Sequence, residues 1–230
     1  MNVYLTRLTV QHPDSIIESI EDIMSKAQAN KDVFMFCVTT LTNMWSNSSL
    51  VCFDKIYSHM VGSYYLSGRA DWVDSLQLSR MKSRYDNMRY NNCYEKAENL
   101  VMNDINGNAT SLYKLEAKYT IMVFWSVDCG HCKSKLPRLA EFLKEYQQYG
   151  IKVYAVLTDR ATDRWKELVT ERGLEGFVNV ADPENKTNFQ TLYDIYSTPV
   201  IYLLDKDKTI MVKRLEVEQL EKFLKHELGL

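Results

Sequence analysis

The chain has 230 residues, enough for one large domain or two modest ones. Its 46% hydrophobic and 25% charged residues are ordinary for a folded protein, and 8 Gly with 4 Pro argue against low-complexity disorder. A formal net charge of −2 provides no long-range attraction to nucleic acid. No apolar run approaches the ~20 residues of a membrane-spanning helix. We therefore expect neither a nucleic-acid partner nor a membrane span.

Residues 1–99 show helical periodicity, and we expect an all-α N-terminal domain of unknown role. Pro13 is suited to the first turn of a helix, and Ser15 with Glu18 has the spacing of a capping box. A second helix is predicted from after Asn30 to the polar residues 46–49, and a third ends near Gly68. A fourth is predicted over residues 71–98, where no glycine or proline interrupts the chain.

The pattern changes near Leu100, and residues 100–230 alternate between strands and helices. Asn106-Gly107 predicts a hairpin turn. The predicted strands are 119–125, 151–157, 177–180, 199–204 and 210–214. The predicted helices are 132–149, 161–172, 188–195 and 216–228. Interleaved strands and helices indicate an α/β domain with a partly parallel sheet.

Cys129-Gly130-His131-Cys132 lies where a buried strand is followed by a helix. The thiolate is the form of cysteine that attacks a disulfide, and a helix N-terminus stabilises it. Cys129 is therefore predicted to be the exposed nucleophile, and Cys132 to resolve the mixed disulfide. His131 adds a possible positive charge beside Cys129, and Asp128 opposes it by like-charge repulsion.

Alternative interpretations of this pair are half of a zinc site or an inert structural disulfide. Four ligands are usual for structural zinc, and no second close pair of Cys or His occurs, so we predict no metal. Cys37, Cys52 and Cys93 lie in apolar surroundings and are interpreted as free, buried cysteines without a redox role, although Cys37 and Cys52 could bridge a helical hairpin.

Residues Val123 to Cys132 resemble the strand-to-helix active-site segment of the thioredoxin superfamily, and Ser197-Thr198-Pro199-Val200 resembles the loop that carries its cis-proline. The resemblance implies a thioredoxin fold, a central mixed sheet flanked by helices, over residues 100–230. It implies that Thr198 and Pro199 bind the substrate backbone, with Pro199 cis. The residues expected to modulate the dithiol are Trp125, Asp128, Gly130, His131 and Lys135.

The lead-in residues Asn106-Gly107, Ser111-Leu112 and Lys118-Tyr119 resemble the extracytoplasmic TlpA/ResA-like branch of that superfamily. The branch implies a bacterial periplasmic or envelope location, with the leader absent from this sequence; the alternative is cytoplasmic. Lys135 stands where the branch often has a glutamate, and could lower the pKa of Cys132 by turning inward or lie solvated on the helix face. The proton acceptor for Cys132 is not identified by the resemblance.

These observations predict a thiol–disulfide oxidoreductase that exchanges disulfides with protein substrates, with the Cys129–Cys132 disulfide as its redox group and no other cofactor. The branch favours a reductase, whereas Cys-Gly-His-Cys resembles the centre of the isomerases. Predicted partners are protein thiols and disulfides and an upstream electron donor or acceptor protein. A homo-oligomer formed through the helical domain is possible. The alternatives are a protein-binding module with a vestigial or regulatory dithiol and, third, a metal carrier.

Overall fold

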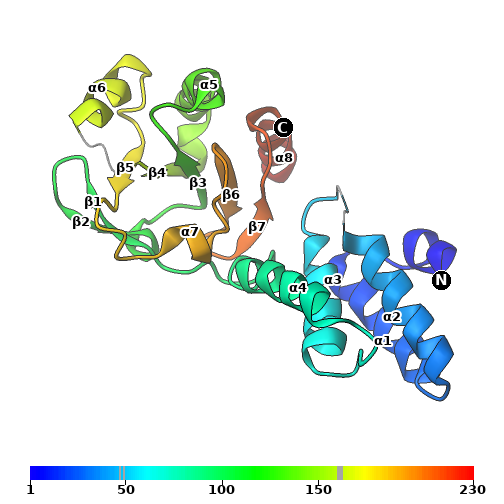
Figure 1. Cartoon of the computed structure of the whole chain (residues 1–230). Helices are drawn as coiled ribbons and strands as arrows, with labels where there is room; N and C mark the ends of the chain where they lie inside the picture. Colours follow the sequence, from blue (N-terminus) through cyan, green and yellow to red (C-terminus); the bar gives the residue numbers. More distant parts are fainter. Residues whose placement is uncertain (47, 49, 160–162) are drawn as a thin grey trace. The chain divides into compact units, whose positions relative to one another are not determined.

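The computed structural model describes residues 1–46, 48, 50–159 and 163–230. The chain divides into two compact units, which we call the helical unit (Met1–Asn92) and the sheet unit (Cys93–Leu230). Figure 1 shows helices in the first and a sheet with helices around it in the second. In the described part of the chain, none of the helices has both the length and the apolar character that crossing a membrane requires.

The helical unit packs its amphipathic helices around an aromatic-rich core. Its elements are the π-helical turn η1 (Tyr4–Leu8), α1 (Pro13–Ala27), α2 (Lys31–Ser46), α3 (Asp54–Met60), the π-helical η2 (Val61–Leu66) and α4 (Ser75–Met88). Ile16, Ile20 and Met24 recur on one face of α1 and are buried, as helical spacing requires. The predicted capping box is absent, because the N-cap is His12, three residues before Ser15, and its Nδ1 accepts a hydrogen bond from the Asp14 N–H.

The fourth predicted helix is shorter than expected, because α4 ends at Met88. Residues 93–98 instead run beside a strand of the sheet unit. Tyr94 N–H donates to the Ile210 carbonyl, and Ile210 N–H donates to the Glu95 carbonyl. This backbone pairing places the start of the sheet unit at Cys93, seven residues before the composition change at Leu100.

In the described part of the sheet unit, seven strands form one sheet in the order β2-β1-β5-β4-β3-β6-β7. The strands are β1 (Val101–Asp104), β2 (Ala109–Ser111), β3 (Tyr119–Trp125), β4 (Ile151–Leu157), β5 (Val178–Ala181), β6 (Val200–Leu204) and β7 (Ile210–Lys213). The helices are the 3₁₀ turns η3 (Leu112–Lys114) and η4 (Gln147–Tyr149), and α5 (Gly130–Tyr146), α6 (Asp163–Glu171), α7 (Phe189–Leu192) and α8 (Val217–Leu228). Ala161, where the helix over residues 161–172 was predicted to start, lies outside the described residues.

Strand β3 is the centre of this sheet, and its position determines where the site lies. It pairs in parallel with β4, with Trp125 opposite Leu157, and antiparallel with β6, with Phe124 opposite Val200. Every residue of β3 is buried, as its apolar run predicts. The segments after β3 and β4 and the segment before β6 therefore meet at one edge of the sheet. The predicted class, a mixed sheet flanked by helices after a helical region, is confirmed.

Candidate active site

The two cysteines of the Cys-x-x-Cys motif lie at the start of α5 and form a disulfide, with an S–S distance of 2.37 Å. Cys129 is the N-cap residue, and its Sγ accepts a hydrogen bond of 3.0 Å from the Cys132 N–H. Cys132 is fully buried, whereas Cys129 is partly exposed. The helix N-terminus thus directs an N–H group at the accessible sulfur, an arrangement that favours a thiolate there after reduction.

The loop before β6 closes over the same sulfur. The Thr198–Pro199 peptide bond is cis. Cys129 Sγ lies 3.2 Å from the Thr198 carbonyl oxygen. Since Val200 pairs with Phe124 across the sheet, the β3–β6 register brings this loop to the end of β3. Two segments that are 69 residues apart in sequence thereby lie together at Cys129.

Asp159, just after β4, holds the segment that leads into the dithiol. Its Oδ1 accepts a hydrogen bond of 3.1 Å from Ser126 Oγ, and its Oδ2 accepts one of 2.5 Å from the Val127 N–H. Local sequence around Asp159 gives no sign of this role. The available signal was topological: parallel neighbouring strands end at the same edge, so the residues after Trp125 and Leu157 emerge together.

Arg172, which follows α6, supports the same segment from the other side. Its Nη2 donates to the Val127 carbonyl at 3.2 Å, and its guanidinium carbon lies 5.4 Å from the centre of the Trp125 ring. Burial lowers the pKa of Arg172. The peptide groups on both sides of Val127 are thus bound by charged side chains. Arg172 could not be recognised from local sequence, because its partner Val127 is 45 residues away.

The predicted modulators separate into two groups. Asp128, Gly130 and His131 are exposed around Cys129, and Trp125 is fully buried beneath the loop. Lys135 instead lies against Glu216 and Glu218.

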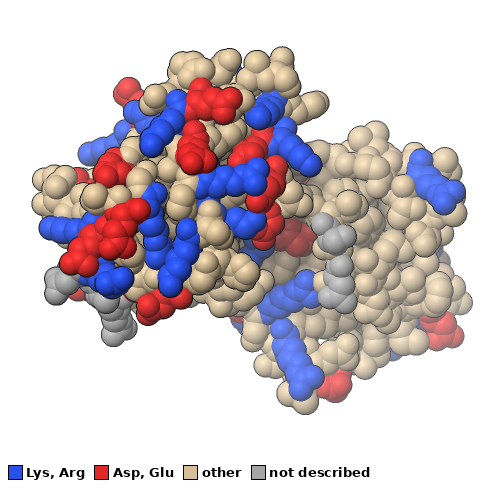
Figure 2. All heavy atoms as spheres, turned by 90° about the horizontal axis from the view of Figure 1, so that it is seen from above, with Lys and Arg blue, Asp and Glu red and all other residues tan. Residues whose placement is uncertain are grey.

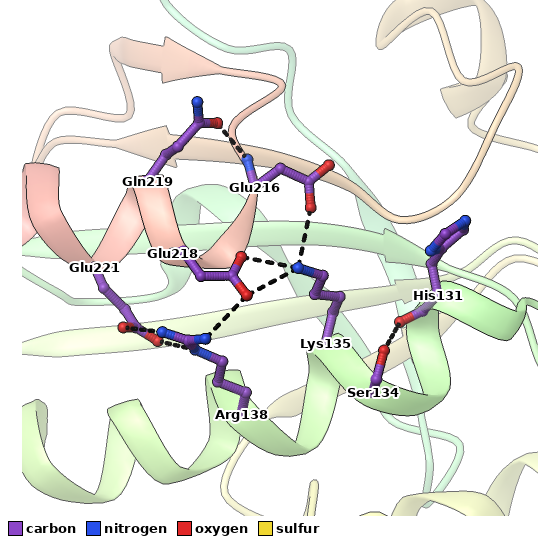
Figure 3. A network of polar contacts seen from close by, with 8 residues as sticks. All are labelled: His131, Ser134, Lys135, Arg138, Glu216, Glu218, Gln219 and Glu221. Atoms are coloured by element: carbon purple, nitrogen blue, oxygen red, sulfur yellow. Dashed lines mark hydrogen bonds and ion pairs between the residues drawn. The ribbon is translucent and has the colours of Figure 1, made fainter.

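The Lys135 ammonium is directed at Glu216 and Glu218, at the start of α8 (Figure 3). It lies 2.8 Å from Glu218 Oε1 and 3.5 Å from Glu216 Oε2. Hydrogen bonding to Glu218 raises the pKa of Lys135 and lowers the pKa of Glu218. The hypothesis that Lys135 turns inward to lower the pKa of Cys132 is therefore not supported by its position, and neither is the picture of an unpaired, solvated lysine.

The three cysteines outside the motif differ from one another in their bonding state. Cys37 is a buried free thiol, as predicted, and burial raises its pKa. Cys52 and Cys93 are not free thiols in the structure, so the prediction is wrong for these two. Within the described ranges, no three His, Cys, Asp or Glu side chains gather so as to hold a metal ion.

The fold and this site define a thioredoxin-like protein: a cysteine pair at the start of a helix, faced by a cis-proline loop at the end of the central strand. The chain belongs to the AhpC/TSA family, whose profile matches residues 94–213. The helical region corresponds to a domain of unknown function, DUF5106, matched over residues 1–91.

Individual relatives agree with this assignment. The thiol-disulfide oxidoreductase ResA of Bacillus thuringiensis (strain Al Hakam) is 28% identical over 134 residues, which cover 57% of this chain and 76% of the relative. A domain of a possible thiol-disulfide isomerase from Cytophaga hutchinsonii has 40% identity and a TM-score of 0.56, covering 60% of this chain and 93% of that one. A thioredoxin-like protein from Bacteroides caccae, at 20% identity, has a TM-score of 0.69 and covers 94% of this chain and 78% of that one, a likeness of fold alone.

Proposed function

We propose that this protein is a thiol–disulfide oxidoreductase that exchanges disulfides with protein substrates through Cys129 and Cys132. The observation that carries the proposal is the asymmetry of the pair. One sulfur is accessible at a helix N-terminus and accepts an N–H hydrogen bond of 3.0 Å, while the other cysteine is fully buried. Such an arrangement suits one attacking and one resolving cysteine. The names of the relatives support the same class of reaction.

In the reduced protein, the Cys129 thiolate attacks one sulfur of a substrate disulfide. A Cys129–substrate S–S bond forms, the substrate S–S bond breaks, and the other substrate sulfur leaves with the electron pair and takes up a proton. The Cys132 thiol then loses its proton, attacks Cys129 Sγ and releases the second substrate thiol. The protein is left with the Cys129–Cys132 disulfide, and two electrons have passed to the substrate.

Thr198 and Pro199 are proposed to bind the substrate during this exchange. The Thr198 carbonyl lies beside Cys129 Sγ, so its peptide group borders the space where a substrate sulfur must lie. Backbone groups recognise any extended polypeptide, which suits an enzyme that acts on several proteins.

We propose that electrons flow towards the substrate, and that a separate donor protein reduces the centre again. The reductase direction and an extracytoplasmic location both rest on the likeness to ResA. Isomerase activity is the competing direction, and the relative named as a possible thiol-disulfide isomerase favours it.

The first test is the reduction potential of the centre, measured by thiol labelling and mass spectrometry across glutathione and dithiothreitol buffers. A value near about −270 mV supports a reductase, whereas about −180 to −120 mV would reassign the protein to the isomerases and oxidases. Cys129→Ser should abolish the reduction of a protein disulfide, and Cys37→Ala, which removes a free thiol in the helical unit, should not. A pair that does not titrate would contradict the proposal and favour the binding-module alternative.

A further inference from the structure

A hollow of about 370 Å³ lies directly beside the dithiol. Asp128, the residue before Cys129, and Lys133, the residue after Cys132, both line it. Val127 and Leu168 form its apolar part and are 8% and 4% exposed. Because its walls continue the chain on both sides of the dithiol, a substrate bound with its disulfide at Cys129 would place a neighbouring side chain at this hollow.

The charged side chains of the hollow carry a positive excess. Lys133, Arg164 and Arg172 line it, against two carboxylates, Asp128 and Glu171. On the face of the sheet unit that Figure 2 shows, positive and negative side chains are interspersed. The excess of positive charge is therefore local to the hollow.

Two of the three cations have donor groups to spare. Arg172 is held by Val127 through Nη2, but its buried Nη1 has no hydrogen-bond partner among the described residues. Among the described residues, Arg164 makes a loose ion pair of 3.9 Å with Glu167 on its own helix. A buried donor without an acceptor is unfavourable, and a guanidinium matches the two oxygens of a carboxylate. The chemistry of the hollow thus suits a carboxylate better than an amide or an ammonium group.

We propose that the hollow is a substrate subsite for an acidic side chain, an Asp or Glu within about three residues of the substrate's reacting cysteine. This inference rests on the proposed function and adds a specificity to it. Lys133 and Arg164, which are exposed, bind the carboxylate, Arg172 adds a fixed positive charge at the wall of the hollow, and the apolar part contacts the methylene groups of the acidic side chain. Asp128 and Glu171 repel a second acidic group and so limit the subsite to one.

The test uses three oxidised peptides that each contain one disulfide. They are identical except at one position, two residues from a cysteine, which holds Glu in the first peptide, Gln in the second and Lys in the third. The rate constant for their reduction by the reduced full-length protein is measured by stopped flow. We expect the Glu peptide to react about five- to tenfold faster than the Lys peptide at low salt, with Gln between them. The ratio should narrow at high salt, because screening weakens the attraction.

Matched variants then locate the origin of the preference. Lys133→Gln and Arg164→Gln should each reduce the Glu-to-Lys ratio, and Arg164→Glu should reverse it. The controls are Lys144→Gln on α5 and Lys166→Gln on α6, which remove equally exposed cations from the same helices outside the hollow. Arg172 is left intact, since its loss would also release Val127.

The outcomes separate the two proposals. A wild-type protein that reduces all three peptides at one rate overturns the subsite and leaves the proposed function standing. A preference that the control variants reduce as much as Lys133→Gln does also overturns it, because the charge is then sensed across the whole surface. Failure to reduce any peptide would contradict the proposed function itself.

Discussion

The two units of this protein use their polar side chains differently. In the helical unit, Glu21 accepts a hydrogen bond from Tyr64, and Arg84 lies over the Tyr57 ring and donates to the Ser46 carbonyl. In the sheet unit, Asp159 and Arg172 bind the backbone around Val127, at the entrance to the dithiol. At the dithiol, these backbone contacts hold the segment that leads into Cys129, and the described part of the helical unit holds no such segment beside a reactive pair.

The largest expected effect tests whether the two cores differ in their importance for activity. Phe124 is fully buried and contacts three aromatic rings, those of Phe189, Tyr193 and Tyr202. Phe124→Ala should cost about 3–5 kcal/mol of unfolding free energy, since it removes a large buried ring and leaves a cavity. Urea unfolding measures this. We expect disulfide exchange to slow as well, because Phe124 directly precedes Trp125 at the end of β3.

The matched variant is Phe34→Ala in the helical unit, where Phe34 lies against Tyr64 and Trp72. It should cost a similar free energy of unfolding, about 3–5 kcal/mol. The exchange rate, measured where both variants are folded, should stay at the wild-type value. If Phe34→Ala slows exchange as much as Phe124→Ala does, the expectation that disulfide exchange depends on the core of the sheet unit alone is wrong.

The next largest effect is expected at Asp159, whose carboxylate binds the segment that leads into Cys129. Asp159→Ala removes two hydrogen bonds from the Ser126–Val127 segment and should cost about 1.5–3 kcal/mol of unfolding free energy, the usual range for a hydrogen bond to a charged group. Because this segment leads to Cys129, the rate constant for attack on a substrate disulfide should fall too. Stopped-flow reduction of a protein disulfide measures it.

Asp182→Ala is the control for Asp159, because the Asp182 carboxylate likewise accepts backbone N–H bonds, but from Lys186 and Thr187 in the loop after β5 rather than from the segment before Cys129. It should destabilise the protein without slowing exchange. Equal slowing of exchange by both variants would mean that general destabilisation of the fold, rather than loss of the contacts to Ser126 and Val127, slows the reaction.

The sequence predicted those parts of the molecule that local patterns determine. Strands β3 and β4 have the predicted bounds, because each is an apolar run that a sheet buries on both faces. The fourth helix was predicted too long, because the pairing of residues 94–97 with the β7 hairpin overrides a local pattern that lacks any glycine or proline.

The candidate site was predictable only in its covalent part. Cys129 and Cys132 are neighbours in sequence, and Thr198-Pro199 was found through a resemblance. Arg172 and the partner of Lys135 were not predictable, because each contact joins residues that are 45 to 83 positions apart. Nothing in a local pattern specifies such a pair, since it arises only when two helices have packed on the sheet.

Glu21 in the helical unit should make a smaller, pH-dependent contribution to the free energy of unfolding. Burial alone would raise the pKa of Glu21, but hydrogen bonds from Tyr64 and His59 outweigh it and hold the pKa below the ordinary 4.5. The unfolded state therefore binds the proton more readily, so this contribution is present above pH ~4.5 and is lost as pH falls through the folded pKa. Because the side chain is 48% exposed, solvent screening limits it to about 0.2–1 kcal/mol.

Urea unfolding of wild type and Glu21→Gln at several pH values measures this contribution. The difference between them should be present at pH 7 and shrink towards pH 3. Glu18→Gln, at an exposed position of the same helix, is the control and should have little effect at either pH. A wild-type-to-Glu21→Gln difference that grows as the pH falls would reverse the assigned direction of the pKa shift.

The smallest effect is expected where charged side chains join α5 to α8. Glu218 binds Lys135 and Arg138, and Glu221 binds Arg138 through both of its oxygens (Figure 3). Glu218→Gln should lower the urea midpoint only slightly, because Arg138 keeps Glu221 and Lys135 keeps Glu216. The change should vanish at 1 M salt, since these side chains are partly solvated and their attraction is screened.

The same variant decides what Lys135 does. With Glu218 in place, the Lys135 ammonium is directed away from the dithiol, so Glu218→Gln should leave the exchange rate and reduction potential unchanged as long as Lys135 stays with Glu216. A shift in reduction potential with Glu218→Gln that disappears in the double variant Glu218→Gln/Lys135→Met would show the opposite. The ion pair would then restrain a lysine that can turn towards Cys132, and α8 would take part in setting the redox properties of the centre.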